Sequence, residues 1–225
     1  MQTQVILFDI NETVLDLSPL RPKFNQFFGH HHHMDTWFAM LLHSSTVCIA
    51  TGVKTDFKSL AQAALYNLAG RLNITLSHGD CHTLLNTFAQ LPAHQDIEPA
   101  LKHLKQAGYK LVAFSNSSHA LLDAQLAHAR IVDLFDDVIS VEAAGTFKPA
   151  KAAYQLAITT LECPADKLRL VATHDWDTHG ALSAGLKAAH INRLNSPYHS
   201  HYKQPDVMAN NMQQLVHDII ERDAS

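Results

Sequence analysis

A carboxylate stands at the end of the first apolar run of the chain, where it could act as a nucleophile. The apolar residues 5–8 predict a buried strand, Asp9 follows directly, and Thr13 comes four residues later. Open parallel sheets bind ligands at the carboxyl ends of their strands, so Asp9 is a candidate for covalent displacement chemistry. The alternative interpretation is an aspartate that caps a helix after the strand.

Other polar residues follow later strand-like runs or precede helices. They are Ser115 with Asn116, Lys148 before Pro149, and Asp177. Because parallel strands end at one edge of their sheet, we expect these side chains to meet Asp9 there. A nucleophile, a hydroxyl donor, a lysine and a second carboxylate suit a covalent displacement. Each also has a structural alternative, namely a solvated loop lysine, backbone hydrogen bonds at a turn, or a helix N-cap.

The chain must fold so that these positions converge. Helical spacing of apolar residues predicts helices over 20–28, 35–43, 56–72 and 79–90. After residue 92, predicted helices (97–107, 120–129, 150–161 and near 180–184) alternate with predicted strands (110–114, near 138–140, 168–172 and 188–192). Such alternation predicts an α/β protein with a doubly wound parallel sheet. We expect an α/β core of residues 1–15 and 92–225, and a helical cap of residues 16–91 that closes over Asp9.

Composition excludes several functional classes. The 225 residues are 47% hydrophobic with a net charge of -4, and Lys and Arg are scattered, which argues against nucleic acid or membrane partners. No apolar stretch approaches the ~20 residues of a membrane span. The early strand leaves no room for a signal peptide, and three separated cysteines show no disulfide or zinc spacing. We expect a cytoplasmic protein with a small anionic substrate, and a homodimer stays open.

Four consecutive histidines, His30 to His33, lie inside the chain. An exposed turn between helices is the favoured interpretation over a metal site, because nothing in the sequence would fix the geometry of the ligands. Their role is left open.

The order of the motifs resembles the haloacid dehalogenase superfamily over essentially the whole chain, and within it the 2-haloacid dehalogenases of type II. The matching segments are Asp9 with Thr13, Ser115-Asn116, Phe147-Lys148-Pro149 with Tyr154, Trp176-Asp177 with Gly180-Ala181, and Ile191-Asn192-Arg193. The resemblance implies a Rossmann-type core with an inserted helical cap.

The expected reaction is the hydrolysis of a small 2-substituted carboxylic acid, in particular a 2-haloacid. Asp9 would attack C2, expel the leaving group and form an ester, which water hydrolyses with Asp177 and Lys148 ordering that water. Lys148 would keep Asp9 ionised. No metal or other cofactor is expected. The substrate site is expected to comprise Ser115 and Asn116, which would hold the substrate carboxylate, together with Asn11, Tyr154, His174, Phe38 and Trp37.

Four positions depart from the pattern of the dehalogenases. Asn11 replaces an aromatic residue, His174 an asparagine, and Ala172 a serine. Phe38 follows Trp37 where these enzymes carry an arginine that grips the halide. Loss of that cation removes a donor to the leaving halide, leaving His174, Asn11 or the Asn116 amide to help, and predicts a slow or unusual dehalogenase.

Two other functions stay open. One is a magnesium-dependent phosphohydrolase, in which Asp9 takes up a phosphoryl group. It is opposed by Asn11, which cannot act as a general acid, and by Ala172 and Thr173, where the first carboxylate of the fourth motif would stand. Asp175 is a weak substitute because it lies only two residues before Asp177. The other is a catalytically weak relative with a binding role, suggested by Phe38.

Overall fold

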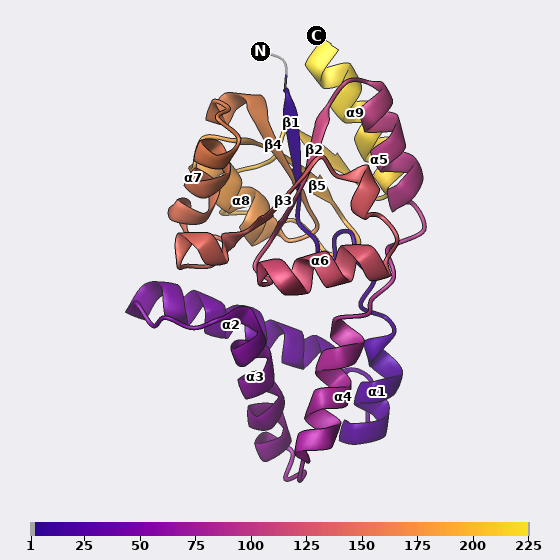
Figure 1. Cartoon of the computed structure of the whole chain (residues 1–225), viewed down its shortest axis with the longest axis vertical. Helices are drawn as coiled ribbons and strands as arrows, with labels where there is room; N and C mark the ends of the chain where they lie inside the picture. Colours follow the sequence, from indigo (N-terminus) through magenta and orange to yellow (C-terminus); the bar gives the residue numbers. More distant parts are fainter. Residues whose placement is uncertain (1–2, 225) are drawn as a thin grey trace.

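A computed structural model describes residues 3–224, and a six-stranded parallel sheet forms its centre (Figure 1). The strands are β1 (Val5–Phe8), β2 (Lys110–Ser115), β3 (Asp137–Ser140), β4 (Leu168–Ala172), β5 (Lys187–Ile191) and β6 (Val207–Ala209), in the order β3-β2-β1-β4-β5-β6. Phe8 of β1 lies opposite Ala113 of β2 and Val171 of β4. Asp9 therefore leaves the sheet between two neighbouring strands, and the predicted α/β fold is confirmed.

Helices cover both faces of the sheet. One face carries α5 (Ile97–Gln106), α6 (His119–His128) and α9 (Met212–Ala224), and the other carries α7 (Lys151–Thr160) and α8 (Asp175–Ser183) (Figure 1). Alternate residues of β1 serve the two layers, with Ile6 and Phe8 in the first and Val5 and Leu7 in the second. Burial on both sides explains why β1 is apolar throughout. Short 3₁₀ turns lie at Val132–Leu134, Val141–Ala144 and Ala165–Lys167.

Four helices between β1 and α5 form a separate bundle beyond the carboxyl ends of the strands (Figure 1). They are α1 (Leu20–Phe28), α2 (His33–Thr51), α3 (Phe57–Arg71) and α4 (His78–Phe88). Trp37 anchors this bundle, since its ring packs against Phe24 and Phe88 and its indole N–H donates to the Ala61 carbonyl at 3.0 Å. We call this bundle the helical insert.

The helical insert makes direct contacts with the sheet layer. Lys54 Nζ donates to the Gly145 carbonyl at 2.8 Å, and the rings of Phe57 and Phe147 lie 6.2 Å apart. Gln125 on α6 donates to the carbonyl of Phe88 at the end of α4. These contacts hold the insert against the edge of the sheet where Asp9 emerges.

Several elements differ from the sequence-based expectations. The helix α2 continues eight residues beyond the predicted end at His43 and stops at Gly52, whose φ is 73°. Its last turns contain β-branched and hydroxyl residues of low helix propensity, but burial of Ser45 and Cys48 stabilises them. The helix α8 begins at Asp175 instead of near Gly180, because acidic residues are stabilised in a first helical turn. The elements β6 and α9 lie outside the predicted set.

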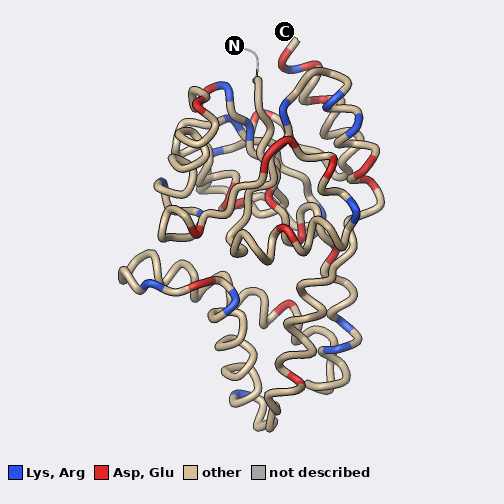
Figure 2. The backbone as a smooth tube through the Cα atoms, viewed as in Figure 1, with Lys and Arg blue, Asp and Glu red and all other residues tan. Residues whose placement is uncertain are grey.

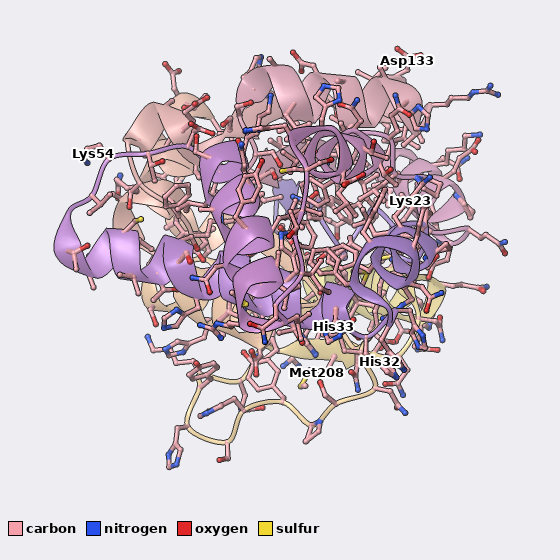
Figure 3. All side chains as sticks on the ribbon, turned by 90° about the horizontal axis from the view of Figure 1, so that it is seen from below. Lys23, His32, His33, Lys54, Asp133 and Met208 are labelled. Atoms are coloured by element: carbon pink, nitrogen blue, oxygen red, sulfur yellow. The ribbon has the colours of Figure 1, made fainter. Side chains whose placement is uncertain are left out.

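Surface features agree with the composition. Lys and Arg residues occur in both the sheet layer and the helical insert, interspersed with acidic residues (Figure 2). No helix within residues 3–224 is long and apolar enough to cross a membrane. His30, His31 and His32 are exposed in the turn before α2, and Figure 3 marks His32 and His33 at the rim of the insert.

Candidate active site

The centre of the site is an ion pair between Asp9 and Lys148. Asp9 Oδ1 accepts a hydrogen bond from Lys148 Nζ at 2.9 Å, and the two side chains are only 7% and 1% exposed. Burial alone would raise the pKa of Asp9, but the charge of Lys148 and a hydrogen bond from His174 hold it well below its usual range. Asp9 is therefore an ionised carboxylate at neutral pH, as a nucleophile requires.

Lys148 is held in place by several acceptors. Its Nζ donates to Asp177 Oδ2 at 2.7 Å and to the Phe114 carbonyl at 3.1 Å, and its backbone N–H donates to Asn116 Oδ1 at 2.8 Å. Burial lowers the pKa of Lys148, but Asp177 and Asp9 more than offset this, so the pKa is raised and the amine stays charged. The result is one buried cation between two carboxylates.

Tyr154 positions Asp177. The Tyr154 hydroxyl donates to Asp177 Oδ1 at 2.6 Å, and both side chains are fully buried. A Cβ at position 180 would collide with this hydroxyl, so Gly180 is required for the approach of α7 to α8. The structure thus assigns Tyr154 a contact with Asp177 instead of the expected contact with substrate, because no surface of Tyr154 is open to a ligand.

Thr13 orients the other oxygen of Asp9. Its hydroxyl donates to Asp9 Oδ2 at 2.7 Å and accepts from the Thr173 backbone N–H at 2.9 Å. These bonds connect the loop after β1 to the end of β4. They restrict rotation of the Asp9 side chain, which is useful for a nucleophile that must attack along one direction.

His174 lies between two carboxylates. Its Nδ1 is 3.2 Å from Asp9 Oδ2, and its Nε2 is 2.9 Å from Glu12 Oε2. Burial lowers the pKa of the imidazole, but hydrogen bonds to Asp9 and Glu12 raise it to about 10. A second cation therefore stands beside the candidate nucleophile. Its ring stacks on Trp176 at 5.1 Å between centroids and lies 6.0 Å from Phe38 of α2, so Phe38 faces the site as expected.

This arrangement predicts a pH dependence of stability. Because the folded-state pKa of His174 lies above its ordinary value of 6.5, its contribution is complete below pH 6.5 and disappears as the pH rises toward about 10. The free energy of unfolding should therefore decrease over this window, and His174→Gln should remove much of the decrease. Urea unfolding at a series of pH values measures this free energy. Equal slopes of the free energy against pH for wild type and His174→Gln would contradict the assignment.

Three other predicted site residues make their hydrogen bonds to groups other than the Asp9 carboxylate. Ser115 is fully buried, and its hydroxyl accepts from the Ser117 backbone N–H at 3.1 Å, so its contact with a substrate stays a prediction. Trp37 likewise belongs to the interior of the helical insert, and not to the substrate site. Asn11 is turned toward α6, where it donates to Ser117 Oγ at 3.2 Å and accepts from Gln125 at 3.1 Å.

Sequence reasoning missed Glu12, Ser117, Gln125 and Thr173. Glu12 lies inside the segment from Asp9 to Thr13, but only its backbone φ of 71° turns its carboxylate to His174. The sequence did contain a signal for Gln125, because it is a polar residue on the apolar face of α6, beside Leu122 and Leu126.

A cavity of about 380 Å³ lies between α2 and the sheet layer. Lys148 and Pro149 line it from the core, Trp176 from α8, and Leu42 from α2. The other lining residues are Ala39, His43, Ser45, Thr46 and Tyr202, so the walls mix apolar and polar side chains.

Comparisons with known proteins agree with this geometry. The chain is 29% identical over 158 residues to the (S)-2-haloacid dehalogenase H-109 of Pseudomonas putida, covering 70% of this chain and 66% of that protein. It is 24% identical over 212 residues to the (S)-2-haloacid dehalogenase 2 of Pseudomonas sp. strain CBS-3, covering 93% of each. The crystal structure of the L-2-haloacid dehalogenase RSc1362 superimposes with a TM-score of 0.93 at 27% identity, covering 97% of this chain and 99% of that one.

A family model described as haloacid dehalogenase-like hydrolase matches residues 3–172. The matched region runs from β1 to the end of β4, and includes Asp9, Thr13, the whole helical insert and Lys148. The chain belongs to the haloacid dehalogenase-like hydrolase family.

Proposed function

We propose that the protein hydrolyses the carbon–halogen bond of a small 2-haloacid through an ester intermediate on Asp9. The observation that carries the proposal is the buried pair of Asp9 and Lys148, with Lys148 held on its other side by Asp177. Curated relatives named (S)-2-haloacid dehalogenase support the choice of substrate class.

In the first step an oxygen of Asp9 attacks C2 of the substrate, and the halide leaves with the electron pair of the carbon–halogen bond. Lys148 keeps the carboxylate ionised, and Thr13 orients it. Asn116 Nδ2 makes no hydrogen bond within residues 3–224, so it is a candidate donor to the substrate carboxylate.

A magnesium-dependent phosphohydrolase is less well supported. Magnesium needs several oxygen ligands around the nucleophile, but the Asp9 oxygens are engaged by Lys148, Thr13 and His174. The Asp175 carboxylate accepts from the His199 backbone N–H. A charged imidazole beside Asp9 would also repel the ion.

Three further proposals concern organisation, location and assembly. We propose two domains, with residues 16–91 as a cap on the core of 1–15 and 92–225. Cys48, Cys81 and Cys163 are unpaired, which suits the reducing cytoplasm. Sedimentation velocity distinguishes a homodimer from a monomer. A catalytically weak binding protein is disfavoured, because folding alone does not need a buried cation between two carboxylates.

The direct test is release of halide from short 2-haloacids, followed with an ion-selective electrode, beside a phosphatase panel with magnesium. We expect chloride from (S)-2-chloropropionate and no phosphate from the second panel. Phosphate release without halide release would overturn the proposal in favour of the phosphohydrolase.

Phe38→Arg should accelerate the reaction. The Phe38 ring lies 6.0 Å from the ring of His174, which contacts Asp9, so an arginine at this position of α2 would lie near the departing halide and assist it. Since such a donor contributes about 10²–10³ in rate, we expect kcat/KM to rise at least about 10-fold.

Phe38→Met is the matched control, because it makes a similar change in shape without adding charge. An equal gain in both variants would show that packing matters and charge does not. No gain at all, with a wild-type kcat already near about 10 s⁻¹, would contradict the idea that the missing arginine slows this enzyme.

A further inference from the structure

The hydrolytic half of the reaction needs a group that takes a proton from water. Asp177 is poorly placed for this task, because its two carboxylate oxygens already accept hydrogen bonds from Lys148 at 2.7 Å and Tyr154 at 2.6 Å. It is also fully buried. These contacts fix Asp177 as the partner of Lys148 and leave the role of base to another side chain.

His174 contacts the carboxyl group of the nucleophile directly. Its Nδ1 lies 3.2 Å from Asp9 Oδ2, so it reaches the carboxyl group that becomes the ester. A nucleophile, a base within hydrogen-bond reach of it, and a third group that orients the base form the arrangement typical of covalent hydrolases. Glu12 completes this arrangement, because its Oε2 lies 2.9 Å from the other ring nitrogen.

The loop after β1 is shaped to deliver Glu12. Its φ of 71° is the left-handed conformation, which is unfavourable for a non-glycine residue. The Glu12 backbone N–H donates to the Leu15 carbonyl at 3.0 Å, and the Glu12 carbonyl lies 3.2 Å from His94 Nε2. Unfavourable backbone conformations persist where surrounding contacts hold them, and they cluster at functional sites.

We propose that His174 is the general base that activates water for hydrolysis of the Asp9 ester, and that Glu12 is the positioning residue that orients its ring. This inference rests on the proposed dehalogenation. It adds a histidine base and a carboxylate partner to the nucleophile.

The resting site is arranged so that the base becomes available only after the first step. In the free enzyme the two carboxylates keep His174 protonated, with its pKa raised to about 10. Formation of the ester removes the charge of Asp9, while Lys148 stays positive nearby. The pKa of the imidazole then falls, and its proton passes to solvent along the partly exposed Glu12, whose side chain is 17% exposed.

The second step is hydrolysis of the Asp9 ester by water. Neutral His174 takes a proton from water as the water oxygen bonds to Cγ of the Asp9 ester. Collapse of the tetrahedral intermediate breaks the bond between Cγ and the alkyl oxygen, and the alkoxide takes the proton from His174. The 2-hydroxy acid leaves, and the Asp9 carboxyl returns its proton to His174, which restores the resting site.

The test is a rapid-mixing experiment with (S)-2-chloropropionate that follows chloride release and the intact mass of the protein. His174→Gln should release one chloride per site and then stall, with the mass of one propionate ester located on Asp9. Ester hydrolysis should fall by about 10²–10⁴-fold, the usual contribution of a general base. Glu12→Gln should hydrolyse the ester slowly and accumulate less of it. His103→Gln, an exposed histidine on α5, is the control and should accumulate none.

The pH dependence separates a base from a structural role. The groups that face His174 or act on its charge are Asp9, Glu12, Phe38, Trp176 and His190. In wild type the rate of ester hydrolysis should rise with pH as the imidazolium loses its proton, whereas the residual rate of His174→Gln should be flat. A structural role would leave the shape of the profile unchanged and would overturn the inference.

The other outcomes are equally decisive. Continuous turnover by His174→Gln near the wild-type rate would overturn the base assignment. A folded variant that releases no chloride would also overturn it, because His174 would then act in the first step. A wild type without any halide release would overturn the proposed function, and this inference with it.

Discussion

Asp9→Asn is expected to abolish halide release from (S)-2-chloropropionate while the fold remains intact. An amide fits the same space but cannot form the ester, and removal of a covalent nucleophile costs enzymes about 10⁴-fold or more in kcat. Halide release gives the activity, and circular dichroism with thermal melting checks the fold. Because the amide lacks the charge that Lys148 faces, some stability should also be lost.

Isotope labelling distinguishes covalent attack from direct attack by water. A single turnover of wild type in heavy-oxygen water should place one heavy oxygen on Asp9, since water attacks Cγ of the ester and not C2 of the substrate. Peptide mass spectrometry locates the label. A label found only in the hydroxy acid product of the first turnover would contradict the ester intermediate.

Lys148→Met is expected to damage both activity and stability. The methionine fills similar volume, but it leaves Asp9 and Asp177 buried with no cation between them. Removing one partner of a buried ion pair costs about 3–5 kcal/mol of unfolding free energy. One carboxyl group should then take up a proton, and kcat/KM should fall by about 10³-fold, because a protonated Asp9 is a poor nucleophile.

Lys151→Met is the matched control, an exposed lysine at the start of α7. It should change neither kcat/KM nor the free energy of unfolding measurably. The effect of Lys148→Met should also depend on pH. The pKa of Asp9 is held below its ordinary value of 3.8 by Lys148, so this contribution to stability exists above that pH and is lost as the pH falls. The stability difference between wild type and variant should therefore shrink in acid, and an equal difference at all pH values would contradict this account.

The predictable part of the protein is the part in which local pattern and global fold agree. The alternation of helical and strand-like runs after residue 92 implied a parallel sheet, and the continuous apolar run of β1 implied burial on both faces. Asp9, Lys148 and Asp177 each follow a strand or open a helix, so the topology alone predicted that they meet at one edge of the sheet.

Helix boundaries were less predictable because burial overrides propensity. The last two turns of α2 contain β-branched and hydroxyl residues, and the sequence pattern ended this helix at His43. Burial of Ser45 and Cys48 carries it on to Thr51. Such contacts come from residues far along the chain, which a local pattern does not contain.

The sequence by itself determined the α/β class, the inserted helices and the positions of the nucleophile and its lysine, since hydrophobic period and strand ends are local properties. Only the tertiary structure decided which side chains contact one another. Tyr154 holds Asp177, Trp37 anchors the insert, and Ser115 is buried at the end of β2. The pairing of Glu12 with His174 depends on a left-handed backbone and on two segments 162 residues apart. Hydrogen bonds and burial of this kind arise only when distant segments pack together, and they set the charge of a histidine beside the nucleophile.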